Sequence, residues 1–227
     1  MRAIILPHKL NTSMESKNRT AFNRSFLDEV PVVGILRGIA YGDVVRILPL
    51  CKASGIRNIE ITMNSMDVGK SMAHALENYG DSMNIGAGTV CNMKDLGLAL
   101  DHGASFIVAP NLNVEVVREC VRLGVPIFPG ALTPTEIHRA WDLGATMVKV
   151  FPIDTLGAKY IKNIRAPFDD IKLLPTGGID ATNVQGYFKA GASGIGVSGG
   201  LFDKEMVRNK NWKALENHIM SFMSRIP

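Results

Sequence analysis

The chain has 227 residues, of which 46% are hydrophobic and 20% are charged, and this length and composition suit one large domain with a well-developed core. The formal net charge of +4 comes from residues 1–26, which hold five basic side chains and one acidic one, whereas the rest of the chain has 20 of each. This balance argues against the basic face that nucleic-acid binding requires, and no apolar run is long enough to cross a bilayer.

The first 30 residues are expected to precede the folded core. Residues 1–15 are expected to form a disordered or loosely ordered leader and residues 16–30 an extra helix, within one domain over residues 16–227. From about residue 30, short apolar runs alternate with amphipathic stretches. The strand-like runs are Pro31–Leu36, Asn58–Thr62, Asn84–Ala87, Phe106–Ala109, Pro126–Phe128, Thr146–Phe151, Ile171–Pro175 and Gly194–Val197. The helix-like stretches include Tyr41–Ser54, Met93–Asp101, Val114–Leu123, Thr133–Asp142, Ala158–Arg165 and Ala181–Lys189.

Strand–helix units repeated eight times in this length predict an α/β fold, a single (β/α)8 TIM barrel with an extra N-terminal helix. The alternative is a doubly wound open sheet. Against that alternative, no Gly-x-Gly-x-x-Gly motif follows the first strand.

The cysteines argue for a reducing compartment. Cys51, Cys91 and Cys120 are far apart and odd in number, which does not fit a disulfide framework. The opening apolar segment is too short for a signal peptide, so the expected location is the cytoplasm. No Cys-x-x-Cys pair or Cys/His cluster is present, and no metal site is predicted.

A lysine lies inside the apolar run Met147–Pro152. Strand alternation places Met147, Lys149 and Phe151 on one face. Burial lowers the pKa of an ammonium group and raises the fraction of free amine. A free amine is a nucleophile toward carbonyl carbon, so Lys149 suggests Schiff-base chemistry. The alternative is a lysine at a strand end whose amine reaches water.

The second strand carries a carboxylate that is predicted to point inward. Because helices pack outside a barrel, Ile59 and Ile61 are expected to face them, and Glu60 then faces the interior. A carboxylate there is costly unless it is paired or functional. The alternative for Glu60 is a structural ion pair with Lys149 or Arg37.

Polar and glycine residues gather at the carboxyl ends of the predicted strands, where barrels of this type form their active sites. Arg37, Thr89 and Pro110 end the first, third and fourth strands. Thr176-Gly177-Gly178 and Ser198-Gly199-Gly200 follow the seventh and eighth. Paired glycine turns at those two places predict a phosphate site built from backbone N–H groups, although either pair alone is commonly only a turn.

One carboxylate, one buried amine, hydroxyl donors and a phosphate site form a consistent set. The lysine would attack a ketone, the resulting iminium would withdraw electrons, and the glutamate would move protons directly or through a water. This combination would cleave the carbon–carbon bond beta to the carbonyl of a phosphorylated keto sugar acid without a metal.

Six segments resemble the bacterial KDPG/KHG aldolases, the 2-dehydro-3-deoxy-6-phosphogluconate and 4-hydroxy-2-oxoglutarate aldolases. The segments are Gly34–Gly38, Ile59–Thr62, Ile85–Val90, Phe128–Gly130, Val148–Pro152 and Leu174–Ile179. The resemblance covers about residues 22–202 and implies a class I aldolase, typically a homotrimer. The implied reaction gives pyruvate and D-glyceraldehyde 3-phosphate in the Entner–Doudoroff route.

The resemblance also implies roles for individual residues. Lys149 would form the Schiff base and Glu60 would be the general acid/base. The residues implied in substrate binding are Arg37, Thr62, Asn64, Thr89, Pro110, Phe151 and Thr176, and those implied in phosphate binding are Gly177, Gly178, Ser198 and Gly199.

Position 64 departs from the family pattern. Many members carry arginine four residues after the glutamate as a carboxylate clamp, whereas this chain has Asn64. The Asn64-Ser65 pair resembles the branch acting on 2-dehydro-3-deoxy-6-phosphogalactonate, while residues 166–168 resemble the gluconate branch. Arg37 is then expected to supply the missing charge, and both epimers and the hydroxy-oxoglutarate activity stay open.

Two other functions use the same fold. A metal-dependent phosphosugar epimerase would need two inward aspartates and strand-borne histidines, and the strand ends offer none. A non-catalytic phosphosugar-binding barrel would need neither Lys149 nor Glu60. The presence of both residues favours the aldolase.

Overall fold

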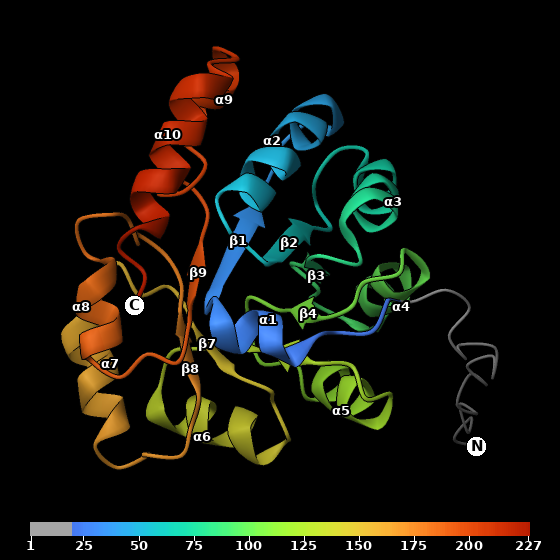
Figure 1. Cartoon of the computed structure of the whole chain (residues 1–227). Helices are drawn as coiled ribbons and strands as arrows, with labels where there is room; N and C mark the ends of the chain where they lie inside the picture. The colour runs from blue at the N-terminus through green and yellow to red at the C-terminus, as the bar shows by residue number, and fades with distance from the viewer. Residues whose placement is uncertain (1–19) are drawn as a thin grey trace, which may run out of the picture.

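Short parallel strands lie at the centre of the structure and helices surround them (Figure 1). The computed structural model describes residues 20–227, so the predicted leader over residues 1–15 lies outside the described residues. The strands are β1 Val32–Leu36, β2 Asn58–Thr62, β3 Asn84–Gly88, β4 Ile107–Val108, β5 Ile127–Phe128, β6 Gly130–Ala131, β7 Val148–Val150, β8 Leu173–Pro175 and β9 Ile195–Val197. The helices are α1 Arg24–Glu29, α2 Tyr41–Ala53, α3 Val68–Tyr79, α4 Met93–Asp101, α5 Val114–Arg122, α6 Pro134–Asp142, α7 Gly157–Arg165, α8 Val184–Lys189, α9 Lys204–Arg208 and α10 Trp212–Met223.

All strand pairs between these elements are parallel. One sheet has six strands in the order β5-β4-β3-β2-β1-β9 and is curved like half of a barrel, and a second has the order β6-β7-β8. Pro129, which has no N–H to donate, separates β5 from β6. A single parallel bridge between Thr176 and Gly196 connects the end of β8 to β9. From β1 to β5 the strand order follows the chain without reversal, unlike the doubly wound alternative.

The helix predicted over residues 16–30 is shorter than expected. Within the described residues it is the six-residue α1, because the side chain of Asn23 accepts the N–H of Ser25 and so begins the helix there. Pro31 follows its end. The helix predicted over Thr133–Asp142 begins where expected, because Thr133 and Glu136 form the capping box of α6.

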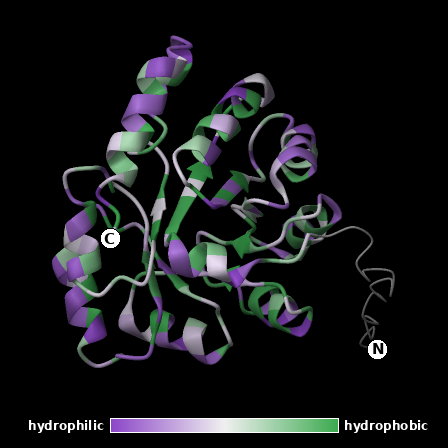
Figure 2. Ribbon diagram, viewed as in Figure 1, coloured by the Kyte–Doolittle hydropathy of each residue, from purple (hydrophilic) through white to green (hydrophobic). Residues whose placement is uncertain are grey.

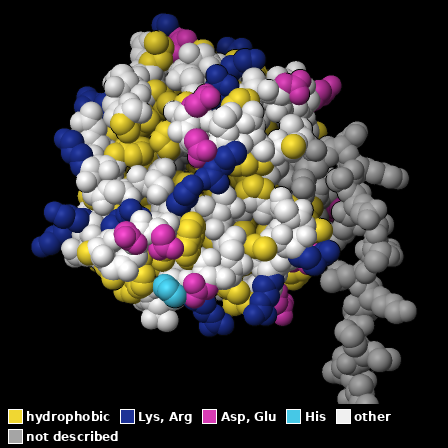
Figure 3. Space-filling view, turned by 60° about the horizontal axis from the view of Figure 1, so that its bottom comes forward, with side chains coloured by type: hydrophobic (Ala, Val, Ile, Leu, Met, Phe, Trp, Pro, Cys, Tyr) yellow, Lys and Arg dark blue, Asp and Glu magenta, His cyan; other side chains and the backbone are white. Residues whose placement is uncertain are grey.

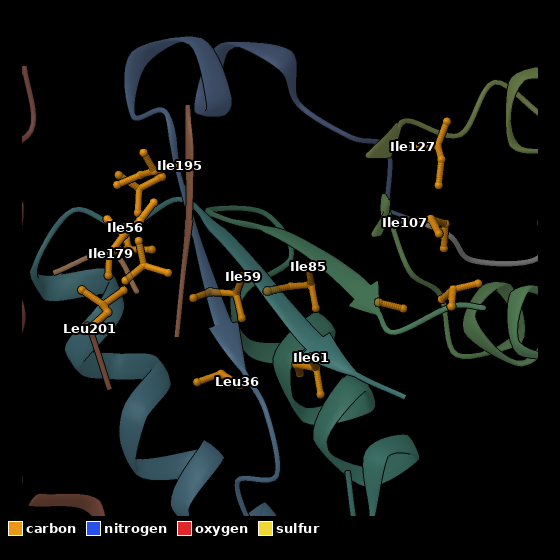
Figure 4. Packing of buried hydrophobic residues seen from close by; sticks show 14 of the residues in the cluster. Leu36, Ile56, Ile59, Ile61, Ile85, Ile107, Ile127, Ile179, Ile195 and Leu201 are labelled. Atoms are coloured by element: carbon orange, nitrogen blue, oxygen red, sulfur yellow. The ribbon is translucent and has the colours of Figure 1, made fainter. Parts of the chain in front are cut away.

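The apolar side chains form two layers, as strand alternation predicts. The outer cluster lies between strands and helices and includes Ile59 and Ile61, which Figure 4 shows beside their neighbours from other strands. The inner cluster is enclosed by the strands; its members are Leu27, Val33, Ile35, Phe106, Val108, Phe128, Met147 and Leu174. Hydrophobic residues accordingly dominate the strands, and polar ones lie on the outer helix faces (Figure 2). On the face shown in Figure 3, basic and acidic side chains are interspersed.

Three asparagines hold α1 against the amino-terminal ends of the strands. Asn84 Nδ2 donates to Asn58 Oδ1 and to Asn23 O, both at 2.8 Å, and Asn84 Oδ1 accepts the Asn23 N–H at 2.7 Å. Asn58 Nδ2 donates to the carbonyls of Val30 and Val32. Asn58 and Asn84 are buried, so each bond satisfies a group that water does not reach.

We predict that Asn84→Ala lowers the free energy of unfolding by about 2 kcal/mol, because it leaves buried partners unsatisfied. Urea unfolding measures this as a lower midpoint at unchanged slope. The control is Asn217→Ala, an exposed asparagine of α10, which we expect to change stability by less than about 0.5 kcal/mol. Equal effects of the two substitutions would contradict the role assigned to Asn84.

Candidate active site

Lys149 is the middle residue of β7, between Val148 and Val150 of the outer cluster. Its side chain is 1% exposed, so the interpretation of a lysine that reaches water is wrong. Its Nζ lies 5.2 Å from the ring centroid of Phe151, and within residues 20–227 the amine forms no ion pair within 4.0 Å. Burial lowers the pKa of Lys149.

Glu60 faces the interior from β2, as predicted, and is also 1% exposed. A Cβ at Gly88 on the neighbouring strand would lie 1.7 Å from Glu60 Oε1, so this position requires glycine. Neither carboxylate oxygen has a hydrogen-bond partner among the described residues. The alternative of a direct ion pair with Lys149 or Arg37 is therefore wrong.

Charge still couples these groups over a longer distance. Burial is the largest effect on Glu60 and raises its pKa, while the charges of Lys149 and Arg37 oppose that shift. For Lys149 the largest effect is burial, which lowers the pKa; Glu60 raises it and Arg37 lowers it. Burial therefore favours the free, nucleophilic amine of Lys149, and by raising the pKa of Glu60 it makes the ionised carboxylate a stronger base than usual.

Thr89 presents a hydroxyl to the same region. It follows Gly88 with φ = +60°, a conformation that threonine rarely adopts. Its Oγ1 is buried and has no hydrogen-bond partner among the described residues. A strained backbone together with an unpaired buried hydroxyl is typical of a position that serves a ligand.

A short network joins the loops after β1 and β2. Thr62 Oγ1 lies 2.9 Å from Ser65 Oγ, and Ser65 Oγ accepts the N–H of Gly38 at 3.0 Å. Thr62 is buried, whereas Arg37 and Asn64 are exposed. Sequence reasoning did not single out Ser65 as a site residue, although its place beside Asn64 was noticed. The hydrogen bond from Gly38 joins Ser65 to a loop that is 27 residues away in the sequence.

The predicted phosphate residues surround one cavity of about 650 Å³. Arg37, Phe151 and Thr176 line it together with backbone from two turns, residues 176–180 and 196–200. These turns hold all four predicted phosphate-binding residues: Gly177, Gly178, Ser198 and Gly199. Lys149, Glu60, Thr62, Asn64, Thr89 and Pro110 do not line it. Phe151, which lies near the Lys149 amine, connects the two regions.

Backbone conformation equips these turns to hold an anion. Gly177 and Gly178 both have positive φ, at +111° and +63°, a backbone conformation that residues with a side chain rarely adopt. Within the described residues the N–H groups of Gly177, Gly178, Gly199 and Gly200 have no backbone acceptor. The Ser198 hydroxyl donates to Ile35 O at 3.0 Å, so we expect Ser198 to offer a ligand its backbone N–H.

Two observations bear on other functions. Within residues 20–227 no group of three or more His, Cys, Asp or Glu side chains is arranged to hold a metal ion. Over the same residues no helix has the length and hydropathy of a bilayer-spanning segment.

The model of the family described as KDPG and KHG aldolase matches residues 24–218. The chain belongs to this family. Its members are aldolases, carbon–carbon lyases, and the lysine and glutamate motifs lie within the matched residues.

Relatives within this aldolase family are named for different substrates. The chain is 33% identical over 175 residues to the 2-dehydro-3-deoxy-6-phosphogalactonate aldolase of Escherichia coli K12, covering 77% of this chain and 85% of the relative. It is 31% identical over 194 residues to the 2-dehydro-3-deoxy-phosphogluconate aldolase of Haemophilus influenzae, covering 83% and 91%. A solved structure described as native KDPGal aligns with a TM-score of 0.81 at 29% identity, covering 87% of this chain and 94% of that one.

Glu60 raises the pKa of Lys149 and Arg37 lowers it, so substitutions at these two residues should shift the pH midpoint of adduct formation in opposite directions. Only the neutral amine attacks pyruvate, so adduct formation rises as pH passes the Lys149 pKa, with a midpoint below the ordinary lysine value of 10.5. Glu60→Gln removes a charge that raises this pKa and lowers the midpoint. Arg37→Gln removes a charge that lowers it and raises the midpoint.

Pulsed trapping with pyruvate and cyanoborohydride, quantified by mass spectrometry from pH 5 to pH 10, measures these midpoints. A shift of the midpoint in the same direction in both variants would show that these two charges do not control the pKa of the amine.

Proposed function

We propose that this protein is a class I aldolase that cleaves 2-dehydro-3-deoxy-6-phosphogluconate to pyruvate and D-glyceraldehyde 3-phosphate. The observation that carries the proposal is a buried lysine without an ion-pair partner whose pKa is coupled to that of a buried, unpartnered carboxyl group. Such an arrangement is costly for stability, and an amine of this kind is suited to covalent catalysis on a ketone.

The chemistry follows from these two groups. The Lys149 amine adds to the keto carbon, and loss of water from the carbinolamine gives an iminium ion. Glu60, directly or through a water, removes the proton of the C4 hydroxyl. The C3–C4 bond then breaks, its electrons pass to the iminium to form an enamine, and the aldehyde leaves. Protonation of the enamine and hydrolysis release pyruvate and restore the amine, so the cycle needs no metal.

The remaining residues bind the two ends of the substrate in this proposal. Thr62, Thr89, Pro110, Phe151 and Thr176 surround the pyruvate portion. Supporting this, Thr89 has a free hydroxyl. The phosphate binds in the cavity of about 650 Å³, on the glycine turns that line it, whose N–H groups suit an anion. In this proposal the phosphate-binding residues of these turns are Gly177, Gly178, Ser198 and Gly199.

The galactonate epimer is the second candidate substrate. It is favoured by Asn64, which replaces the arginine expected four residues after the glutamate, and by the likeness to an aldolase named for that epimer. We infer that Arg37, which lines the cavity, carries the positive charge that Asn64 lacks. The hydroxy-oxoglutarate activity is a third possibility within the same chemistry.

We further propose that the two sheets close into one (β/α)8 barrel through the Thr176–Gly196 bridge, with α1 as the extra N-terminal helix over one end. In this proposal residues 16–227 form the barrel domain. The thiols of Cys51 and Cys91, which form no disulfide among the described residues, fit a cytoplasmic location. A homotrimer is the expected assembly, by family resemblance, and light scattering measures it.

We predict that pyruvate and borohydride add a stable label to Lys149. Lys149→Ala abolishes both labelling and cleavage because Lys149 is the only buried lysine among residues 20–227. Lys159→Ala, an exposed lysine of α7, is the matched control and keeps both. Peptide mass spectrometry locates the label; labelling of the Lys149→Ala variant would refute the assignment.

Glu60→Gln tests the acid/base role separately. We expect cleavage to fall by roughly two to four orders of magnitude, the usual contribution of general acid–base catalysis, while the labelling of Lys149 persists. Coupled assay of pyruvate release measures the loss. Near-normal turnover would remove Glu60 from the mechanism.

The substrate epimer is decided by comparing kcat/KM on the gluconate and galactonate phosphates. We expect Asn64→Arg to raise the ratio in favour of the gluconate substrate, because it restores the arginine common in the family. An unchanged ratio would show that position 64 does not select the C4 configuration.

A further inference from the structure

The cavity that holds the proposed phosphate site receives one side chain from the C-terminal helix. His218 of α10 lines the cavity, and its Nε2 lies 3.0 Å from the carbonyl oxygen of Gly200. Because a carbonyl oxygen only accepts, Nε2 must carry the hydrogen of this bond. The histidine lies 18 residues beyond Gly200, outside every motif that sequence reasoning identified.

The carbonyl that His218 contacts belongs to the peptide that shapes the second glycine turn. The N–H of the same peptide, from Leu201, donates to Ser198 O at 3.0 Å, and Phe202 N donates to Ser198 O at 2.8 Å. Fixing the Gly200 carbonyl therefore fixes the orientation of the whole turn from Ser198 to Leu201. The N–H groups of Gly199 and Gly200, which have no backbone acceptor, are held in place by this turn.

The other side of the turn is fixed by packing. A Cβ at Gly200 would lie 2.0 Å from the Ile179 carbonyl oxygen, so the turn presses against the segment that follows Gly177 and Gly178. Gly199 has open space around it. The Ser198 hydroxyl anchors the start of the turn to Ile35 O, and His218 adds a contact at its far end, on the Gly200 carbonyl.

The ionisable groups around the cavity leave few other ways to hold an anion. Asp203 accepts the N–H of Met206 as the N-cap of α9, and Asp180 accepts the N–H and the hydroxyl of Thr182. Both carboxylates repel a phosphate. Among the described residues that line the cavity, Arg37 and His218 are the only side chains able to carry positive charge.

We propose that His218 is a positioning residue for phosphate binding, acting by holding the Ser198–Leu201 turn through the Gly200 carbonyl. The inference rests on the proposed aldolase function for its substrate, and on the cavity geometry for the phosphate. It assigns the C-terminal helix a part in recognition of the phosphorylated end of the substrate, separate from the chemistry at Lys149.

His218→Ala and His218→Asn remove the contact, whereas His218→Gln keeps an N–H donor at similar reach. We expect the first two to raise KM for the phosphorylated keto acid by roughly tenfold, the effect of one lost hydrogen bond, with kcat nearly unchanged. Cleavage of the same keto acid without its phosphate stays as in the wild type. Glutamine restores most of the affinity, and His138→Ala, an exposed histidine of α6, has no effect.

Inorganic phosphate provides a readout that does not depend on catalysis. Calorimetry with phosphate alone should show affinity roughly tenfold weaker in His218→Ala and His218→Asn, and pyruvate labelling of Lys149 should be unchanged. Three results would overturn the proposal. They are an equal loss of kcat/KM on the phosphorylated and unphosphorylated substrates, an unchanged phosphate affinity in both variants, or a KM in His218→Gln that is as high as in His218→Ala. If the wild type fails to label with pyruvate, the aldolase function falls, while the calorimetry still decides the role of His218.

Discussion

The enclosure of one amine away from water and from any direct ion-pair partner is the constraint on which the site depends. Lys149 and Glu60 are both about 1% exposed, yet the carboxylate oxygens bond to nothing within the described residues. A direct ion pair would stabilise the ammonium and make it a poor nucleophile. The strands keep the two groups apart while Gly88, which has no side chain, leaves the space that Glu60 occupies.

The surrounding structure offsets the cost of this arrangement. Two apolar clusters, one inside the strands and one between strands and helices, stabilise the fold through burial. The polar groups that close the amino-terminal end are fully hydrogen-bonded through Asn58 and Asn84. On the strands and the loops that follow them, the unpaired buried side-chain groups of the described residues are those of Glu60 and Thr89, where a ligand can satisfy them; the others belong to Ser54 and Ser71 on helices. Stability and reactivity are separated along the strand axis.

Strand alternation made the two reactive residues predictable, because a period of two assigns Glu60 and Lys149 to the inner face once Ile59, Ile61, Val148 and Val150 are assigned to the outer one. The glycine turns were predictable from their place after the last two strands. Ser65 and the capping of α1 by Asn23 were not, since each depends on a hydrogen bond. Ser65 has its partner Gly38 in another loop, and no local pattern indicates that pairing.

Arg37 connects recognition to reactivity. The Ser65 hydroxyl holds the N–H of Gly38, so the loop that carries Arg37 is fixed by the loop that carries Asn64. The same guanidinium group lines the phosphate cavity and lowers the pKa of Lys149. An arginine at position 64 would place its positive charge after β2, whereas Arg37 follows β1, so its distance to the Lys149 amine would differ. If Arg37 supplies the charge that Asn64 lacks, as we propose, substrate contacts and amine activation depend on the same side chain, because Arg37 both lines the cavity and lowers the pKa of Lys149.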